Sequence, residues 1–240
     1  MYDQRVTIAE AVENIQKEDY LLPAIQREIV WERDQITDLF DSVLQGYPIG
    51  TFLFWDIDQQ NRDEYKMYGF IKDYITTTKY IETQAQTRNS VVQPDGAGDL
   101  KLILDGQQRL SSFYIGLKGT YTYKQSNRWY RNEDAWKKSK LYLNITSDPD
   151  ELLDADSDRQ SRYEFSFLPQ GQYSGRVVSR GDDLWFRAGA ILNHTNKAER
   201  DNLTFDIIDE HVASDADARK RHVNRNIGEL WDAVHEKSHV

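Results

Sequence analysis

Cysteine is missing from the sequence, and its absence excludes several kinds of protein. Disulfide scaffolds, thiolate zinc sites and cysteine nucleophiles all require that side chain. A metal ion could therefore be held only by histidine and carboxylate groups.

Long apolar runs are missing as well. No stretch approaches the roughly 20 apolar residues that a membrane-spanning helix needs. The opening segment, MYDQRVTIAEAVENIQ, also lacks the basic and then apolar layout of a signal peptide. We therefore expect a cytoplasmic protein that does not enter a membrane.

Positive charge is scarce, since the formal net charge is -10. Nonspecific coating of DNA requires positive charge that releases counterions from phosphate. Any contact with DNA should therefore be confined to a local patch. Acidic residues concentrate at 148–158 and 206–218, and we interpret both stretches as solvated surface.

The remaining composition is that of an ordered globular protein. Hydrophobic residues make up 39% of the chain and aromatic residues 12%, whereas disordered chains are poorer in both. A chain of 240 residues can bury a substantial core. We expect Trp31, Phe52, Phe54 and Trp55 to pack in that core rather than to stack on bases.

Helical periodicity is clearest in the first fifth of the chain. Thr7 and Glu10 form a capping box in front of apolar residues at helical spacing, which predicts a helix over 8–18. A second helix is predicted over 32–45, with Gly46 as its C-terminal cap.

Short apolar or alternating segments predict the strands. They are 20–22, 51–57, 100–105, and the segments TYTYK, SKLYLNI and YEFSFL that follow. The strand LKLILD runs into the helix QQRLSSFYIGLKG, which Gly119 ends. The segment LWFRAGAIL (184–192) is compatible with either type of element.

These elements predict an α+β fold, a mixed α/β body with an appended helical portion. The body covers 1–195 and contains an insertion at about 58–99, whose flexible tip lies near 94–98. Residues 196–240 form the helical extension. The two helices expected in it cover 216–226 and 227–237.

The most informative local sequence is Asp105-Gly106-Gln107-Gln108-Arg109, here called the DGQQR turn. A strand-to-helix turn presents free backbone N–H groups, and the helix dipole adds partial positive charge. Gly106 permits close approach of the backbone, and Arg109 offers a bidentate fork for phosphate oxygens. The turn therefore predicts a phosphate site, where Asp105 could hold a metal ion or orient Arg109.

A purely structural interpretation fits the same residues. In it, Asp105 only caps the helix, and Arg109 pairs with a surface acid. The local pattern alone leaves both interpretations open. Other triphosphate signatures are absent, since the sequence contains neither GxxxxGK[ST] nor GxGxxG, so a nucleotide site must be of the DGQQR kind.

A zinc-protease pattern also occurs, at His235-Glu236-Lys237-Ser238-His239. That motif needs a third ligand downstream, and only one residue follows His239. We interpret the match as a coincidence.

The DGQQR turn and the leucine after it resemble the signature of the GmrSD N-terminal family, which shares the ParB/sulfiredoxin-like fold. A second block, LLPAIQREIVWERDQITDLFDSVLQGYPIGTFLFW, resembles the opening block of that family. The two blocks span residues 20–57 and 100–118. The resemblance implies a ParB/sulfiredoxin-like nucleotide-binding core.

Members of this family act in the restriction of phage or modified DNA. Their N-terminal domain binds and hydrolyses nucleoside triphosphate, and it gates a His-Asn-His-type nuclease in a C-terminal domain or partner. The resemblance therefore implies an antiphage sensor domain that uses GTP or another nucleoside triphosphate, with Mg²⁺ bridging the phosphates. It also implies local contact with DNA, and a homodimer is one further partner to consider.

The resemblance assigns site residues by position. The nucleotide-binding residues are Gln26, Arg27, Asp105, Gly106, Gln107, Gln108 and Arg109. Arg27 and Arg109 would contact the phosphates, and the catalytic group would be Asp105, Gln108 and Arg109. Pro23 precludes a helix before Arg27, which should leave that residue exposed on a turn. No set of side chains is assigned as a metal site.

Two other functions remain open. The chain could be a non-enzymatic reader of DNA modification or a docking module, with Lys101 and Lys118 lining a positive path beside the turn. It could also be a nuclease by itself, which we do not expect because no His-Asn-His constellation is visible. The chain ends with NIGELWDAVHEKSHV, where family members continue, so we expect a shortened chain or a natural short subunit.

Overall fold

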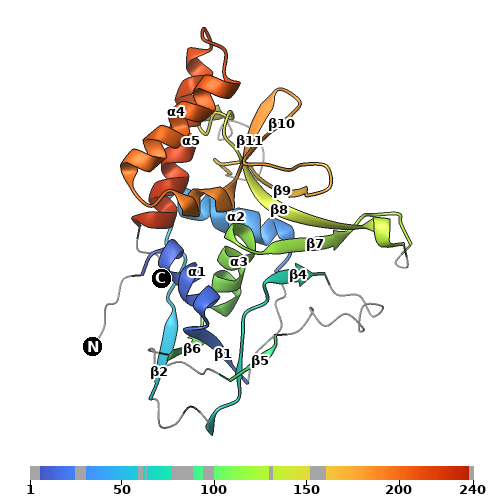
Figure 1. Cartoon of the computed structure of the whole chain (residues 1–240), viewed down its shortest axis with the longest axis vertical. Helices are drawn as coiled ribbons and strands as arrows, with labels where there is room; N and C mark the ends of the chain where they lie inside the picture. The colour runs from blue at the N-terminus through green and yellow to red at the C-terminus, as the bar shows by residue number, and fades with distance from the viewer. Residues whose placement is uncertain are drawn as a thin grey trace.

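The computed structural model describes residues 6–24, 31–58, 62, 64–76, 89–93, 100–129, 132–151 and 161–237. Helices and two mixed β-sheets build the fold (Figure 1), so the expected α+β class is confirmed. The helices are α1 (Ile8–Lys17), α2 (Arg33–Leu44), α3 (Gln107–Leu117), α4 (Lys197–His211) and α5 (Asp217–His235).

The strands of the first sheet come from the N-terminal half of the chain. They are β1 (Tyr20–Pro23), β2 (Leu53–Ile57), β3 (Met67–Tyr68), β5 (Val91–Val92) and β6 (Leu100–Asp105), in the order β2-β6-β1-β3-β5. In the centre of this sheet, β1 runs parallel to β6 although the two strands are far apart in sequence. The edge strand β2 is antiparallel to β6.

The second sheet holds β4 (Asp73–Ile75) and the strands after residue 119. These are β7 (Thr120–Lys124), β8 (Trp136–Asn144), β9 (Phe165–Pro169), β10 (Val177–Arg180) and β11 (Asp183–Arg187). The order is β10-β11-β8-β7-β4, and β9 pairs with β8. The segments TYTYK, SKLYLNI and YEFSFL therefore do form strands of one sheet.

Local sequence signals account for the first two helices. The backbone N–H of Glu10 donates to the Thr7 hydroxyl at 3.2 Å, and the Thr7 N–H donates to the Glu10 carboxylate at 2.8 Å. This reciprocal pair is the predicted capping box. At the end of α2, Gly46 has a φ of 77°, the left-handed conformation that glycine adopts without strain after a helix.

The C-terminal helices differ from the prediction. We expected one helix over 216–226 and another over 227–237, but α5 runs without a break through both. At the expected junction, Asn226 is fully buried, and its side-chain amide donates to the carbonyls of Ile145 and Ser147. A polar residue in the middle of a helix thus docks that helix instead of ending it.

The stretch expected as an insertion, 58–99, supplies strands to both sheets. β3 and β5 extend the first sheet, and β4 pairs in parallel with β7 in the second. The expected tip near 94–98 lies outside the described residues. The ambiguous segment 184–192 forms most of β11 and then a 3-10 helix, Ala188–Asn193.

One hydrophobic core joins these layers. In Figure 1, α1, α2 and α3 lie in the middle, between the two sheets, with α4 and α5 beside the second sheet. Buried residues of α1, α2, α3, α4, α5 and both sheets belong to the same cluster. The boundary near residue 195 stays a prediction, but the C-terminal helices share the core of the body. Among the described helices, none is long and apolar enough to cross a membrane.

Candidate functional site

The DGQQR turn joins two elements that are anchored in the core. β6 buries Leu102 and Ile103, while its last two residues, Leu104 and Asp105, are exposed. On the other side of the turn, α3 is buried at every position from Leu110 to its end. The far end of α3 is held by Lys140, whose ammonium donates to the carbonyls of Lys118 and Gly119 at 2.8 and 2.7 Å. The turn therefore sits at the surface on rigid supports.

Gly106 makes the change of direction possible. Its φ is 89°, and it occupies the N-cap position of α3, where it has no side chain with which to cap the helix. A Cβ at this position would lie 2.8 Å from Cε1 of Phe52 and closer still to Cδ1. Both the left-handed backbone and the packed ring therefore require glycine.

The glutamines of the turn are partly buried. The side-chain amide of Gln107 donates to the carbonyl of Ile103 at 2.9 Å, which ties the start of α3 back to β6. The carbonyl of Gln108 accepts a hydrogen bond from the hydroxyl of Ser112 at 2.7 Å. The first turn of α3 is thus braced by its own residues.

Arg109 connects the turn to the segment between α2 and β2. Its guanidinium donates to the carbonyl of Ile49 and, at 2.7 Å, to the carbonyl of Thr51. It also lies 4.5 Å from the centre of the Phe52 ring, within range of a cation–π contact. Gly50, with φ of 88°, leaves room for this, since a Cβ there would lie 2.7 Å from Nη1 of Arg109. The side chain of Arg109 is only 17% exposed.

These contacts bear on the structural interpretation of the turn. Asp105 does not cap α3; its carboxylate lies 3.6 Å from Nη2 of Arg109 and is 67% exposed. Arg109 therefore pairs within the turn itself and with backbone carbonyls, and sequence reasoning did not foresee the latter. The signal that could have shown it is Gly50, a glycine between two apolar segments of the upstream block.

Lys101 and Lys118 do not form the positive path that we expected beside the DGQQR turn. The ammonium of Lys101 pairs with Asp56 at 2.7 Å. Lys118 is the C-cap of α3, at the opposite end of that helix from Gly106. The two lysines therefore do not line one surface with the DGQQR turn.

The upstream site residues Gln26 and Arg27 lie outside the described residues. Of the aromatic residues in that block, Trp31, Phe52 and Phe54 pack against the core as expected. Trp55 does not: it is 41% exposed, and its ring meets that of Tyr65 at a centroid distance of 4.9 Å. Trp55 alternates with the inward-facing Phe54 along β2, so it points to the opposite face of the sheet.

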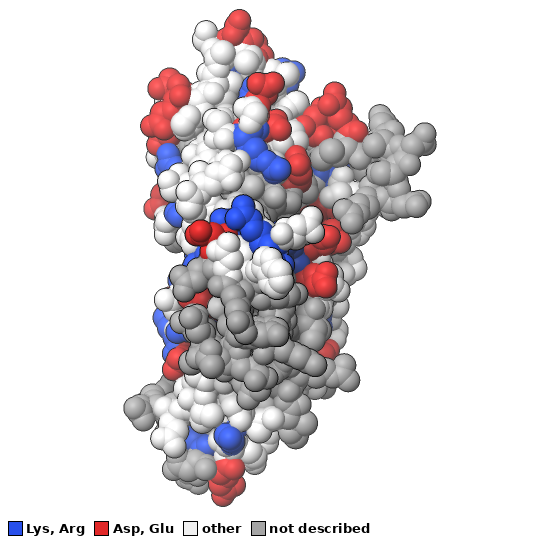
Figure 2. Space-filling model, turned by 90° about the vertical axis from the view of Figure 1, so that its right-hand side faces the viewer, with Lys and Arg blue, Asp and Glu red and all other residues white. Residues whose placement is uncertain are grey.

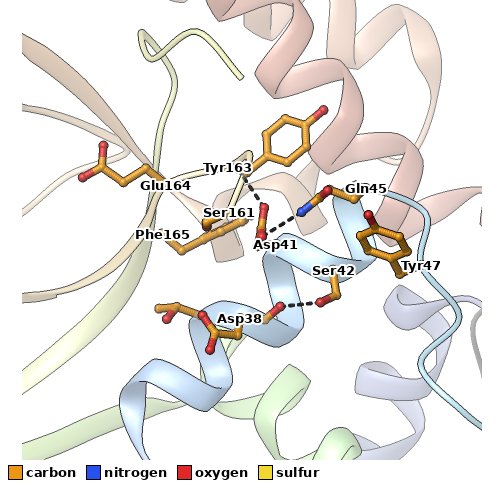
Figure 3. A pocket seen from close by; sticks show the side chains of 10 residues that line it. Asp38, Asp41, Ser42, Gln45, Tyr47, Ser161, Tyr163, Glu164 and Phe165 are labelled. Carbon is orange, nitrogen blue, oxygen red and sulfur yellow. Dashed lines mark hydrogen bonds between the residues drawn. The ribbon is translucent and has the colours of Figure 1, made fainter. Parts of the chain in front are cut away.

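A second feature, which was not predicted from the sequence, is a polar pocket of about 360 Å³ beside α2 (Figure 3). Its centre is Asp41, which is 6% exposed. The Asp41 carboxylate accepts hydrogen bonds from the backbone N–H groups of Tyr163 and Arg162, at 2.7 and 3.1 Å, and from the Gln45 amide at 2.8 Å. Burial raises the pKa of Asp41, against the effect of these hydrogen bonds, which lower it.

The pocket adjoins the segment that Arg109 holds. Tyr47 lines the pocket, and Ile49, two residues further on, accepts the hydrogen bond from Arg109. The pocket and the DGQQR turn therefore share one connection, residues 45–52. A polar stripe at i, i+4 and i+8, Thr37, Asp41 and Gln45, was the sequence signal for this pocket.

Of the zinc-protease pattern, His235, Glu236 and Lys237 are described, whereas Ser238 and His239 lie outside the described residues. His235 shares a hydrogen bond with the carbonyl of Ile191 at 3.1 Å and stacks on Trp231. Burial lowers its pKa. Within the described ranges, no three histidine or acidic side chains converge on a point where a metal ion could sit.

Comparison with known proteins identifies a family and a relative that this chain resembles. The model of a family described as GmrSD restriction endonuclease, N-terminal domain, matches residues 8–218. A protein of Methanocaldococcus jannaschii named "Uncharacterized protein MJ0686" is 33% identical over 96 residues. That match covers 40% of this chain and 14% of the archaeal protein, so it concerns a small part of that relative.

Proposed function

Because this chain belongs to the GmrSD restriction endonuclease N-terminal domain family, we propose that it is a nucleoside-triphosphate-binding and hydrolysing regulatory domain. Family membership implies a part in a restriction endonuclease system. In our proposal the domain senses nucleotide in antiphage defence and gates a nuclease domain or subunit. The DGQQR turn is the nucleotide site.

The observation that carries the proposal is the start of α3. The N-cap residue of this helix is Gly106, which has no side chain to cap it and brings the backbone to the surface without a Cβ. The first N–H groups of a helix have no partner within the helix, and the dipole gives them partial positive charge. A phosphate group placed there would accept hydrogen bonds from these groups.

Arg109 contributes charge and position in this proposal. Two of its contacts go to carbonyl oxygens, and its guanidinium lies 3.6 Å from the Asp105 carboxylate, which leaves part of its five N–H donors for a phosphate. Arg109 also holds residues 49–52 in place. A phosphate that moved Arg109 would therefore also move this segment and the wall of the pocket next to it. This connection is a route by which nucleotide binding could reach the rest of the domain.

Asp105 fits the requirements of Mg²⁺ bound with a triphosphate. Such ions are held by one or two carboxylates together with phosphate oxygens and water. The Asp105 carboxylate is largely exposed, and its one ion pair among the described residues is the 3.6 Å contact with Arg109. Mg²⁺ at this position would neutralise phosphate charge, while Gln108 and Asp105 orient the attacking water.

Calorimetric titration with GTP, ATP, CTP and UTP in Mg²⁺ tests the proposal. We expect one nucleotide to bind with micromolar affinity and Arg109→Ala to abolish binding. Arg109→Ala also removes the contacts to Ile49 and Thr51, so a second variant, Asp105→Asn, changes an exposed group instead. It should leave the melting temperature unchanged and reduce phosphate release at least tenfold. An Arg221→Ala control alters an exposed arginine of α5.

The outcomes separate clearly. If none of the four nucleotides binds the wild-type chain, the proposal is wrong. It is also wrong if Arg109→Ala and Asp105→Asn both bind and hydrolyse nucleotide as the wild type does. A loss confined to the two turn variants supports it.

A further inference from the structure

The strands β7 and β8 continue beyond the second sheet as a two-stranded ribbon. The pairing of β4 with β7 ends at Thr122, and that of β9 with β8 ends at Ser139. Among the described residues, 123–137 therefore have no neighbouring strand on either side. In Figure 1 this ribbon projects to the right, away from the helices.

Hydrogen bonds within the ribbon connect the described residues near its end. The N–H of Gln125 donates to the carbonyl of Ala135 at 2.8 Å, and the N–H of Asn132 donates to the carbonyl of Trp129 at 3.0 Å. The ammonium of Lys124 donates to the carbonyls of Gln125 and Arg128, at 3.0 and 2.9 Å. This bracing presents Arg128 and Trp129 in a defined place.

Trp129 is the most exposed large hydrophobic side chain of the described residues, with 87% of its surface accessible. Tryptophan is on average a highly buried residue, because its ring offers a large apolar area. Arg128 beside it is also exposed, and its guanidinium forms no ion pair with a described residue. An exposed indole beside an exposed guanidinium near the end of a projecting ribbon is suited to contact with another molecule.

The charge of the ribbon points to an anionic partner. Residues 123–137 contain four basic and two acidic side chains, in a chain whose net charge is -10. Figure 2 views the side toward which the ribbon points, and Lys and Arg lie near the middle of it with Asp and Glu on both sides of them. The cations also occupy both faces of the ribbon. Lys137 lies opposite Tyr123 on one face, and Lys138 lies opposite Thr122 on the other.

We propose that the β7–β8 ribbon enters the major groove of duplex DNA. The major groove admits a two-stranded β-ribbon and has phosphates along both sides, which matches cations on both faces. In this arrangement Arg128 and Lys137 contact phosphates, and Trp129 contacts the base edges. Lys138 is partly neutralised by Asp73 at 3.1 Å, so it contributes less. DNA is the favoured anion because the family is one of restriction endonucleases.

The inference shares only the family membership with the proposed function. Nucleotide binding at Arg109 is not needed for it, so the test is made without nucleotide. Fluorescence anisotropy of a labelled duplex is measured with the whole 240-residue chain over a series of salt concentrations. A failure here would leave the nucleotide proposal untouched, and the reverse also holds.

The two key side chains should affect binding differently. Arg128→Ala removes one phosphate contact, so it should weaken binding several-fold and lower the slope of log K against log salt by about 0.9. Trp129→Ala removes an apolar contact, so it should weaken binding on the order of tenfold and leave the slope unchanged. The matched controls are Arg221→Ala and Phe205→Ala, which alter exposed residues of α5 and α4 and should bind like the wild type.

Competitors identify the partner. An RNA duplex of the same sequence should compete poorly, because its major groove is too narrow for a ribbon. The proposal is overturned if the wild-type chain does not bind duplex DNA, or if Arg128→Ala and Trp129→Ala bind it like the controls. It is also overturned if the RNA duplex competes as well as the DNA, or if the chain binds anionic phospholipid vesicles in preference to DNA.

Discussion

Replacement of Gly106 by alanine gives a direct test of how the DGQQR turn is built. The added Cβ meets two separate obstacles. One is the backbone, since a φ of 89° is unfavourable for any residue with a Cβ and costs about 1–2 kcal/mol. The other is the Phe52 ring, whose Cε1 lies 2.8 Å from the position of the new atom. Overpacking of this kind costs about 1–3 kcal/mol. We therefore expect Gly106→Ala to lower the free energy of unfolding by about 2–5 kcal/mol.

A double-mutant cycle separates the two obstacles. Phe52→Ala by itself removes a partly buried ring and its contact with Arg109, so it should destabilise the protein. Combined with Gly106→Ala, it also removes the steric conflict. The double variant should therefore be more stable than the sum of the single effects predicts, by about 1–3 kcal/mol. The backbone cost should remain.

Urea denaturation followed by tryptophan fluorescence measures the free energy of unfolding of each variant, and from these values the cost of Gly106→Ala and the departure from additivity in the double variant. The m-value checks two-state behaviour. If Gly106→Ala costs less than about 0.5 kcal/mol, a range typical of neutral surface changes, the turn is not constrained as described. Strict additivity of the two substitutions would show that the Phe52 ring does not limit the space at Gly106.

Two further predictions concern α5. Gly228 lies inside this helix, and a Cβ added there would meet no atom within 4 Å, so Gly228→Ala should stabilise the protein by about 0.5–1 kcal/mol through helix propensity, measured as a rise in the urea midpoint. The hydrogen bond from Arg225 lowers the pKa of Asp150 below its ordinary value of 3.8, so the stabilisation by this pair is complete above that pH and is lost as the pH falls below it. Asp150→Asn should therefore lower the melting temperature at neutral pH, and the difference in melting temperature between the variant and the wild type should become smaller in acid. An equal difference at about pH 7 and about pH 2 would contradict this assignment.

Local sequence was sufficient for elements whose signals lie within a few residues. The capping box of Thr7 and Glu10 fixed the start of α1, and Gly46 marked the end of α2. The strand LKLILD and the following helix were recognisable because apolar periodicity changes at Asp105. The same signals misjudged α5, since Asn226 is polar in sequence but its side-chain amide donates hydrogen bonds to carbonyls from another part of the chain.

The sequence by itself determined the class of fold, the family and the DGQQR turn, because each depends on contiguous residues. Only the tertiary structure decided what Arg109 contacts, since Ile49 and Thr51 lie about sixty residues away and come close through the pairing of β2 with β6. It also decided that the ribbon end carrying Trp129 projects from the sheet. That depends on where the neighbouring strands stop, and hydrogen bonding between distant segments sets those limits.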